Sequence, residues 1–173
     1  MSAAASRMIG LNFCGTPPTV FQATPHIVKR LLITVALLTL AVPRCPALEW
    51  LTDIPAALAR AKAENKTVLL DFTGSDWCGW CMRLKAEVFD QPEFSTYAHA
   101  NLILVELDFP RKKPQSAEVK KANEALRKKF KVEGYPAFVV LSKDGAEIGR
   151  QDGYAPGGAK AFIAKLDDSK KKD

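Results

Sequence analysis

The sequence has few cysteines, no internal repeat and no long apolar segment. Four cysteines among 173 residues are too sparse for a disulfide-dense mini-scaffold. No apolar run reaches the roughly 18 residues of a transmembrane helix, which excludes a polytopic membrane protein. The hydrophobic fraction of 47% and the charged fraction of 25% are typical of globular proteins, so wholesale disorder is also excluded. The length fits one ordinary domain, or a smaller domain with an appended segment.

Residues 1–47 have the pattern of an N-terminal extension with a signal peptide. Lys29-Arg30 precede a 12-residue apolar run, residues 31–42, and a small-x-small cleavage site ends at Ala47. We therefore expect cleavage before Leu48 and an exported protein, either periplasmic or secreted. The alternative is an uncleaved membrane anchor over residues 31–42. A helix of that length rises only about 18 Å, well short of a bilayer core of about 30 Å, so cleavage is favoured.

The expected mature domain, residues 48–173, is nearly neutral. The leader carries four of the 25 Lys and Arg residues and none of the 19 acids, so the formal charge falls from +6 to +2. Two cysteines leave with the leader, and Cys78 and Cys81 remain. Positive charge gathers over residues 111–131, which hold nine Lys or Arg and two acids. Such a run is usually a solvated helix face. Because these cations lack the regular aromatic interleaving of a nucleic-acid-binding surface, with Phe130 the only aromatic residue among them, we expect no nucleic-acid partner.

Alternating helix and strand patterns in the mature domain predict an α/β fold. Helices are expected over about 53–65, from near Cys78 to about Phe89, after a cap at Asp90, over about 119–130 and over about 159–166. Strands are expected over 67–73, 102–108, 137–142 and 146–150, the last two joined by a Lys143-Asp144-Gly145 turn. Strands that alternate with helices pair in parallel, and the hairpin formed by residues 137–142 and 146–150 adds antiparallel strands. We therefore predict a mixed central sheet with helices on both faces.

The segment Trp77-Cys78-Gly79-Trp80-Cys81 stands at a strand-to-helix junction and carries the chemistry. Free N–H groups and the dipole at a helix N-terminus favour an anion, so the thiol of Cys78 becomes more acidic. The thiolate is the nucleophile in disulfide exchange. Cys81 lies one turn later and can close a disulfide with Cys78. Cys78 is thus the expected attacking residue, and Cys81 the residue that resolves the mixed disulfide.

Zinc binding, haem attachment and a purely structural disulfide are weaker roles for this CxxC pair. A structural zinc site needs four ligands, and the mature chain offers no second cysteine pair and only one histidine, His99. Covalent haem attachment needs a histidine after the second cysteine, where Met82 stands. A purely structural disulfide across so short a loop gains little chain entropy. We therefore expect a redox disulfide, with no metal and no cofactor.

Two further residues near the pair have more than one interpretation. Asp71 lies within an apolar strand, where a carboxylate is costly to bury unless it is paired or neutral. It is either a buried proton acceptor for Cys81 or a strand-end residue that points to solvent or caps the turn. Pro136 follows Tyr135 at the start of a strand. Local sequence favours a trans bond between them, although a cis bond is permitted there.

These residues together resemble the thioredoxin superfamily. The matching features are the strand Leu69-Leu70-Asp71-Phe72, the Trp77–Cys81 motif and the Tyr135-Pro136 pair before a strand and a Gly-containing hairpin. The resemblance covers about residues 50–166. Over this range the chain is similar to exported bacterial thioredoxin-like proteins and to the thioredoxin domain of the transmembrane thiol–disulfide interchange protein. The resemblance implies a thioredoxin fold, a cis Pro136 beside the cysteines and Asp71 as proton acceptor. It also implies that Tyr135 helps to line the substrate groove.

The resemblance implies a protein disulfide oxidoreductase that acts in cell redox homeostasis. Its partners would be protein thiol or disulfide substrates and an unidentified electron donor or acceptor protein, and a monomer is expected. Membrane contact is expected only if the signal segment stays uncleaved. The motif has Gly79-Trp80 between the cysteines and no histidine, which favours the reductase or isomerase direction. The segment Pro110–Gln115 resembles an insertion.

The aromatic residues of the motif have their own interpretation. Trp80, with Gly79 and Tyr135, is expected to hold substrate beside Cys78, whereas Trp77 either shares that role or packs on the domain. An alternative function is a non-catalytic binding module or holdase that uses the Trp77/Trp80 rim. A further alternative is an electron relay dedicated to one partner protein.

Overall fold

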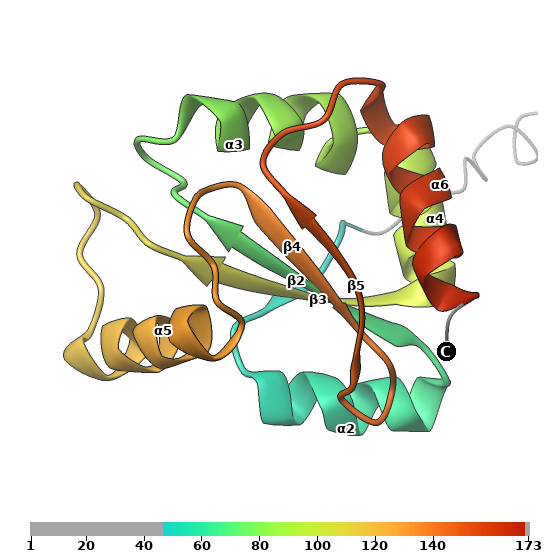
Figure 1. Cartoon of the computed structure of the whole chain (residues 1–173), viewed down its shortest axis with the longest axis horizontal. Helices are drawn as coiled ribbons and strands as arrows, with labels where there is room; N and C mark the ends of the chain where they lie inside the picture. The colour runs from blue at the N-terminus through green and yellow to red at the C-terminus, as the bar shows by residue number, and fades with distance from the viewer. Residues whose placement is uncertain (1–46, 172–173) are drawn as a thin grey trace, which may run out of the picture. The chain divides into compact units, whose positions relative to one another are not determined.

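The computed structural model describes residues 47–171, which form a five-stranded mixed sheet with helices on both faces (Figure 1). The strand order is β1-β3-β2-β4-β5. β1 and β2 both run parallel to β3, whereas β4 runs antiparallel to β2 and β5 antiparallel to β4. This arrangement confirms the predicted α/β fold class. The strands are β1 (Trp50–Leu51), β2 (Thr67–Thr73), β3 (Leu102–Asp108), β4 (Ala137–Leu141) and β5 (Glu147–Asp152).

The helices follow the predicted order, with differences near the cysteines. They are α2 (Ile54–Glu64), α3 (Gly79–Leu84), the π-helix η1 (Lys85–Phe89), α4 (Pro92–Asn101), α5 (Ala117–Lys129) and α6 (Gly158–Lys170). The sequence predicted one helix from Cys78 to Phe89, but its last five residues widen into the π-helix, with the Asp90 N–H donating to the Lys85 carbonyl. The predicted cap at Asp90 was wrong, because Gln91 occupies the N-cap position of α4.

The pleat of β2 divides the core into two clusters and decides where Asp71 lies. Val68, Leu70 and Phe72 pack in the cluster that includes α2 and the end of α5. Leu69 packs in the other cluster, with side chains from α3, η1, α4 and α6. Since alternate residues of a strand share a face, Asp71 lies on the same face as Leu69. The sheet therefore places this carboxyl beneath the α3–η1 segment.

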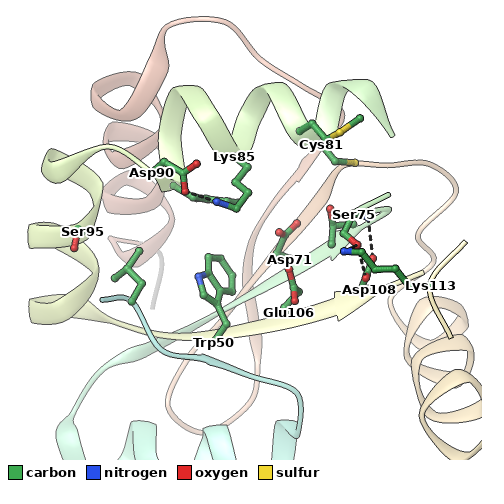
Figure 2. A pocket seen from close by; sticks show the side chains of 14 residues that line it. Trp50, Asp71, Ser75, Cys81, Lys85, Asp90, Ser95, Glu106, Asp108 and Lys113 are labelled. Atoms are coloured by element: carbon green, nitrogen blue, oxygen red, sulfur yellow. Dashed lines mark hydrogen bonds and ion pairs between the residues drawn. The ribbon is translucent and has the colours of Figure 1, made fainter. Parts of the chain in front are cut away.

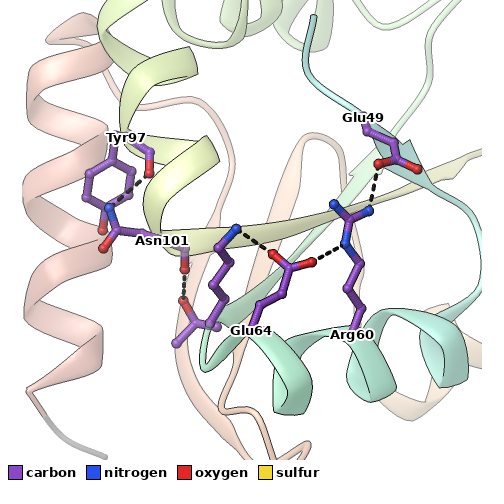
Figure 3. Close-up of polar contacts among 7 residues, drawn as sticks. Glu49, Arg60, Glu64, Tyr97 and Asn101 are labelled. Carbon is purple, nitrogen blue, oxygen red and sulfur yellow. Dashed lines mark hydrogen bonds and ion pairs between the residues drawn. The ribbon is translucent and has the colours of Figure 1, made fainter. Parts of the chain in front are cut away.

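Polar contacts tie the ends of α2 and α4 to the strands (Figure 3). The Arg60 guanidinium donates to Glu49 and to Glu64 at 2.6 Å each, which links α2 to the chain just before β1. The Thr67 hydroxyl donates to the Asn101 carbonyl at 3.3 Å, which links the start of β2 to the end of α4. The Arg60 ion pairs are largely exposed, so each contributes about 1 kcal/mol or less to stability. Their effect is to set how the elements enter the sheet.

The expected leader and cleavage site, residues 1–47, lie outside the described residues except for Ala47. In the part that the structure describes, no helix combines the length and the apolarity needed to cross a bilayer.

Candidate active site

The cysteine pair stands where β2 turns into α3. The Gly74 carbonyl accepts hydrogen bonds from the backbone N–H groups of Trp77 and Cys78, at 3.2 and 2.9 Å, which reverses the chain after the strand. Cys78 is the N-cap of α3, and its Sγ accepts the N–H of Cys81 at 3.2 Å. Cys78 and Cys81 form a disulfide with their Cα atoms 5.2 Å apart. The structure is thus the oxidised form, and both cysteines are buried.

Trp77 packs on the domain. Its indole Nε1 donates to the Phe109 carbonyl at 2.8 Å, and its ring meets the Tyr135 ring edge-on at 5.8 Å between centroids. Gly74 makes this packing feasible, because a Cβ there would lie 2.6 Å from the indole. The sequence did not decide whether Trp77 contacts substrate or packs on the domain, and it did not predict a role for Gly74. The only sequence signal for Gly74 was its place at the end of a buried strand.

Trp80 has the opposite environment. It is 55% exposed, and its ring stacks on Tyr154 at 5.1 Å between centroids. The guanidinium of Arg83 lies over both rings, and the Tyr154 hydroxyl donates to Glu87. The sequence singled out Trp80 but not Tyr154, which follows β5 and is far from the motif in the chain. Gly79 lies between Trp77 and Trp80 in the sequence, and no heavy atom lies within 4 Å of where its Cβ would be.

Asp71 lies in a cavity beneath Cys81 that both polar and apolar side chains line (Figure 2). The cavity has a volume of about 550 Å³, and its lining includes Cys81, Lys85 and Trp50. Asp71 is 6% exposed, and its Oδ1 has no hydrogen-bond partner among the described residues. Burial, and next the negative charge of Glu106, raise the pKa of Asp71 well above its usual value of 3.8. The strand-end interpretation, with the carboxyl in solvent, is therefore wrong.

Two more acids of β3 line the same cavity, and the sequence did not predict their role. Glu106 and Asp108 face it with Asp71, as Figure 2 shows. Burial, then the charge of Asp108, raises the pKa of Glu106. Asp108 is held by Ser75, whose backbone N–H and hydroxyl donate to the carboxylate at 2.9 and 2.6 Å. The cavity is therefore rich in carboxyl groups directly below the buried sulfur.

The Tyr135–Pro136 bond is cis, as the resemblance implies and contrary to the expectation from local sequence. The Pro136 carbonyl accepts the Gly153 N–H at 2.8 Å, which fixes the start of β4 against the end of β5. The Tyr135 ring lies against Trp77 and Phe109, with centroids 5.8 and 5.1 Å away. The structure thus joins Tyr135 to the cysteine motif through Trp77.

Comparisons with known proteins agree with this arrangement. A family model described as a thioredoxin-like domain matches residues 54–170. The chain is 36% identical over 119 residues to the disulfide bond reductase DsbH of Chlamydia pneumoniae, a match that covers 69% of this chain and 70% of that protein. It is 33% identical over 76 residues to the thiol:disulfide interchange protein DsbD of Vibrio cholerae, covering 44% of this chain and 12% of that protein. A solved structure of a DsbH oxidoreductase is similar with a TM-score of 0.68 and 34% identity, over 73% of this chain and 86% of that one. The chain therefore belongs to the thioredoxin superfamily and is a thiol–disulfide oxidoreductase.

Proposed function

We propose that this oxidoreductase works as a reductase of disulfides in exported proteins, with Cys78 as nucleophile. The observation that carries the proposal is the Cys78–Cys81 disulfide at the start of α3, directly above the buried carboxyl of Asp71. The name of the relative DsbH, a disulfide bond reductase, supports this direction of electron flow. The absence of a histidine between the cysteines also fits, since the motif does not resemble strongly oxidising members.

In the first step the Cys78 thiolate attacks one sulfur of the client disulfide. A bond forms between Cys78 Sγ and that sulfur, and the other client sulfur leaves as a thiolate. The N–H of Cys81, which donates to Cys78 Sγ, stabilises the attacking thiolate, as do the free amides at the start of α3. Because the nucleophile needs no metal or cofactor, the chain's own residues suffice for this step.

In the second step Cys81 resolves the mixed disulfide. The Cys81 thiol gives its proton to the Asp71 carboxylate, and its sulfur attacks Cys78 Sγ. The Cys78–Cys81 disulfide forms, the client sulfur leaves as a second thiolate, and two electrons have passed to the client. A buried carboxyl with a raised pKa suits this transfer, because its proton affinity lies nearer to that of a thiol. A second dithiol protein would then restore the reduced pair.

The client would lie across the surface around Cys78. We assign this surface to Tyr135, Pro136, Trp77 and Gly79 on the motif side and to Trp80 on the exposed side. Trp80 offers a large accessible aromatic face, whereas Trp77 acts by holding Tyr135 and the motif in place. Gly79 leaves the approach to the pair open, since nothing lies within 4 Å of where its Cβ would be.

We further propose that residues 1–47 direct export and are removed, so that the mature protein acts in the periplasm as a monomer. Support comes from the basic residues, apolar run and small-residue site of the leader. N-terminal sequencing of protein recovered from the periplasmic fraction tests this. A chain that starts at Leu48 is expected, and one that retains residues 31–42 in the membrane fraction would contradict it.

Insulin reduction tests the activity. Wild-type protein with dithiothreitol is expected to accelerate insulin precipitation, and Cys78→Ala to abolish the acceleration. A Cys81→Ser variant is expected to accumulate mixed disulfides that mass spectrometry can identify. Direction is tested by equilibration with glutathione, and a potential near about −120 mV would contradict a reductase. Binding of unfolded insulin that persists unchanged in Cys78→Ser, without reduction by the wild type, would favour the holdase alternative.

A further inference from the structure

The loop between β3 and α5 presents three consecutive cations beside the active site. Arg111, Lys112 and Lys113, here termed the basic lip, are all exposed. The lip belongs to the segment that the sequence marked as an insertion. Neither the redox chemistry nor the packing of the core requires three positive charges at this place.

Asp76 fixes the basic lip to the loop that carries the cysteines. Its carboxylate accepts the backbone N–H groups of Arg111, Lys112 and Lys113, at 3.0, 2.7 and 2.9 Å. These amide donors hold the pKa of Asp76 at about 2, so the carboxylate is ionised at neutral pH. The lip therefore has a defined position relative to Cys78, two residues after Asp76, although it lies in a loop.

Side-chain contacts bring the lip to the cysteine motif itself. The Arg111 guanidinium lies over the Trp77 ring, with its carbon 3.6 Å from the ring centroid, and Trp77 directly precedes Cys78. Lys113 Nζ donates to the Ser75 hydroxyl at 3.1 Å. A polypeptide whose disulfide reaches Cys78 and that runs over Trp77 would therefore pass the lip.

Among the described residues, no side-chain ion pair neutralises Arg111 or Lys112, whereas Lys113 faces the cavity that Glu106 and Asp108 line and lowers the pKa of Glu106. Within residues 47–171, no ion pair shorter than 4.0 Å involves Arg111, Lys112 or Lys113. The Asp76 carboxylate, bound to their backbone, offsets one of the three charges. Fixed cations of this kind attract negatively charged partners and raise their rate of encounter, most strongly at low ionic strength.

We infer that the basic lip selects client proteins that carry acidic residues close to the disulfide under attack. The inference rests on the proposed reductase function and names the substrate class of that site. An extended chain advances about 3.3 Å per residue, so acids within about four residues of the attacked cysteine can reach the lip. A protein segment is favoured over a lipid or nucleic-acid surface because the lip adjoins the nucleophile, where a protein disulfide must come.

The experiment uses three synthetic peptides with the same internal disulfide, flanked by Glu, Gln or Lys at the same positions. Rate constants for their reduction by the reduced protein are measured at low salt and at about 0.5 M salt. Each is divided by the rate with 2-hydroxyethyl disulfide, an uncharged linear disulfide that reports the intrinsic reactivity of the pair. We expect the Glu peptide to react about fivefold faster than the Lys peptide at low salt. The difference should nearly vanish at high salt.

Lys112→Glu tests the lip with little disturbance of the fold. Its side chain makes no hydrogen bond or ion pair within residues 47–171, and the backbone N–H that Asp76 binds is retained. We expect this variant to lose the preference for the Glu peptide. Lys143→Glu makes the same change of charge in the β4–β5 hairpin, at the opposite end of β4 from Pro136, and should keep the preference.

The outcomes separate this inference from the proposed function. If wild-type protein reduces insulin and all three peptides at equal normalised rates, the lip has no role in selection while the reductase stands. The lip also has no role in selection if Lys112→Glu and Lys143→Glu change the peptide ratio equally. If Lys112→Glu releases the protein from anionic vesicles but leaves the peptide rates unchanged, the lip is a membrane site and the inference is wrong. Failure to reduce insulin or any peptide overturns both proposals.

Discussion

Asp71 of β2 and Glu106 of β3 are register partners, and both side chains line the cavity beneath Cys81. Two neighbouring carboxyls in a partly buried site cannot both ionise without a large electrostatic cost. The lysines that line the same cavity, Lys85 and Lys113, lower the pKa of Glu106 but are not among the causes that shift Asp71. The pair therefore holds at least one proton to a higher pH than an isolated carboxyl would, directly below the resolving cysteine.

Replacing Asp71 with asparagine should stabilise the oxidised protein at neutral pH. Because the pKa of Asp71 is raised, there is a pH range above 3.8 in which its carboxyl keeps the proton in the folded state but is ionised in the unfolded state. Wild-type stability is therefore present below pH 3.8 and is lost as the pH rises toward the folded-state pKa. Asp71→Asn lacks this loss, so its advantage in the free energy of unfolding should grow as the pH rises from 3.8 toward the folded-state pKa of Asp71.

Urea unfolding of both oxidised proteins between pH 4 and 8 measures this difference. Glu133→Gln, at an exposed position after α5, serves as the control and should leave the pH dependence of stability unchanged. An Asp71→Asn variant whose advantage is the same at every pH would show that the carboxyl is not buried as described. In the reduced protein, the same variant should slow resolution of the mixed disulfide by roughly 100-fold at pH 7.

Glu106→Gln should lower the pKa of Asp71, because it removes a neighbouring negative charge that disfavours the ionised form. The acid limb of the pH–rate profile for client reduction should then move to lower pH. Titration of ¹³C-labelled carboxyl groups by NMR reports the same shift directly. The two residues form a coupled pair, so the apparent values belong to both. In an Asp71→Asn background, Glu106→Gln should have no further effect on the profile, and a second shift there would argue against the coupling.

Much of the fold could be predicted because its central strands are buried on both faces. Residues 67–73 and 102–108 are nearly continuous apolar runs, and the structure places β2 and β3 over those same ranges. β1 was missed, because two residues carry no periodic signal. The widening of the helix at Lys85–Phe89 into a π-helix was also missed, since its apolar spacing is compatible with an ordinary helix.

The environment of the site could be predicted only in part. The cysteine pair follows from residue types and spacing alone. The burial of Asp71 depends on which helix covers its face of the sheet, so local sequence left it open. Glu106 acquires its importance from its register with Asp71, and Tyr154 from its contact with Trp80; both relationships join residues far apart in the chain. Such tertiary neighbours leave no local pattern.

The two tryptophans of the motif should respond differently to truncation. Trp80→Ala removes an exposed ring that stacks on Tyr154, so we expect KM for insulin to rise several-fold while stability changes by about 0.5 kcal/mol or less. Trp77→Ala removes a packed ring and its hydrogen bond to Phe109, which should cost about 2–3 kcal/mol of stability. Insulin kinetics and urea unfolding of both variants distinguish these roles. Equal losses of stability would mean that Trp80 also supports the fold.

Gly74→Ala and Gly79→Ala add the same methyl group on either side of Cys78, but only Gly74→Ala should destabilise the protein. At Gly74 the added Cβ would meet the Trp77 indole at 2.6 Å. That ring cannot move aside freely, since Phe109 holds its Nε1 and Arg111 covers its face. We expect the oxidised protein to lose about 1–3 kcal/mol.

Gly79, in contrast, has no heavy atom within 4 Å of an added Cβ and is the first residue of α3. Alanine is the better helix former, so Gly79→Ala should be neutral or stabilising by up to about 1 kcal/mol. Urea unfolding monitored by tryptophan fluorescence, in a background that carries Trp50→Phe and Trp80→Phe, reports both the stability and the environment of Trp77. A Gly74→Ala protein as stable as wild type, with unchanged fluorescence, would contradict the packing of Trp77 against this turn. The Arg111 guanidinium lies over the Trp77 ring. A Gly74→Ala protein whose indole is displaced should therefore also show a weaker preference for acidic peptides.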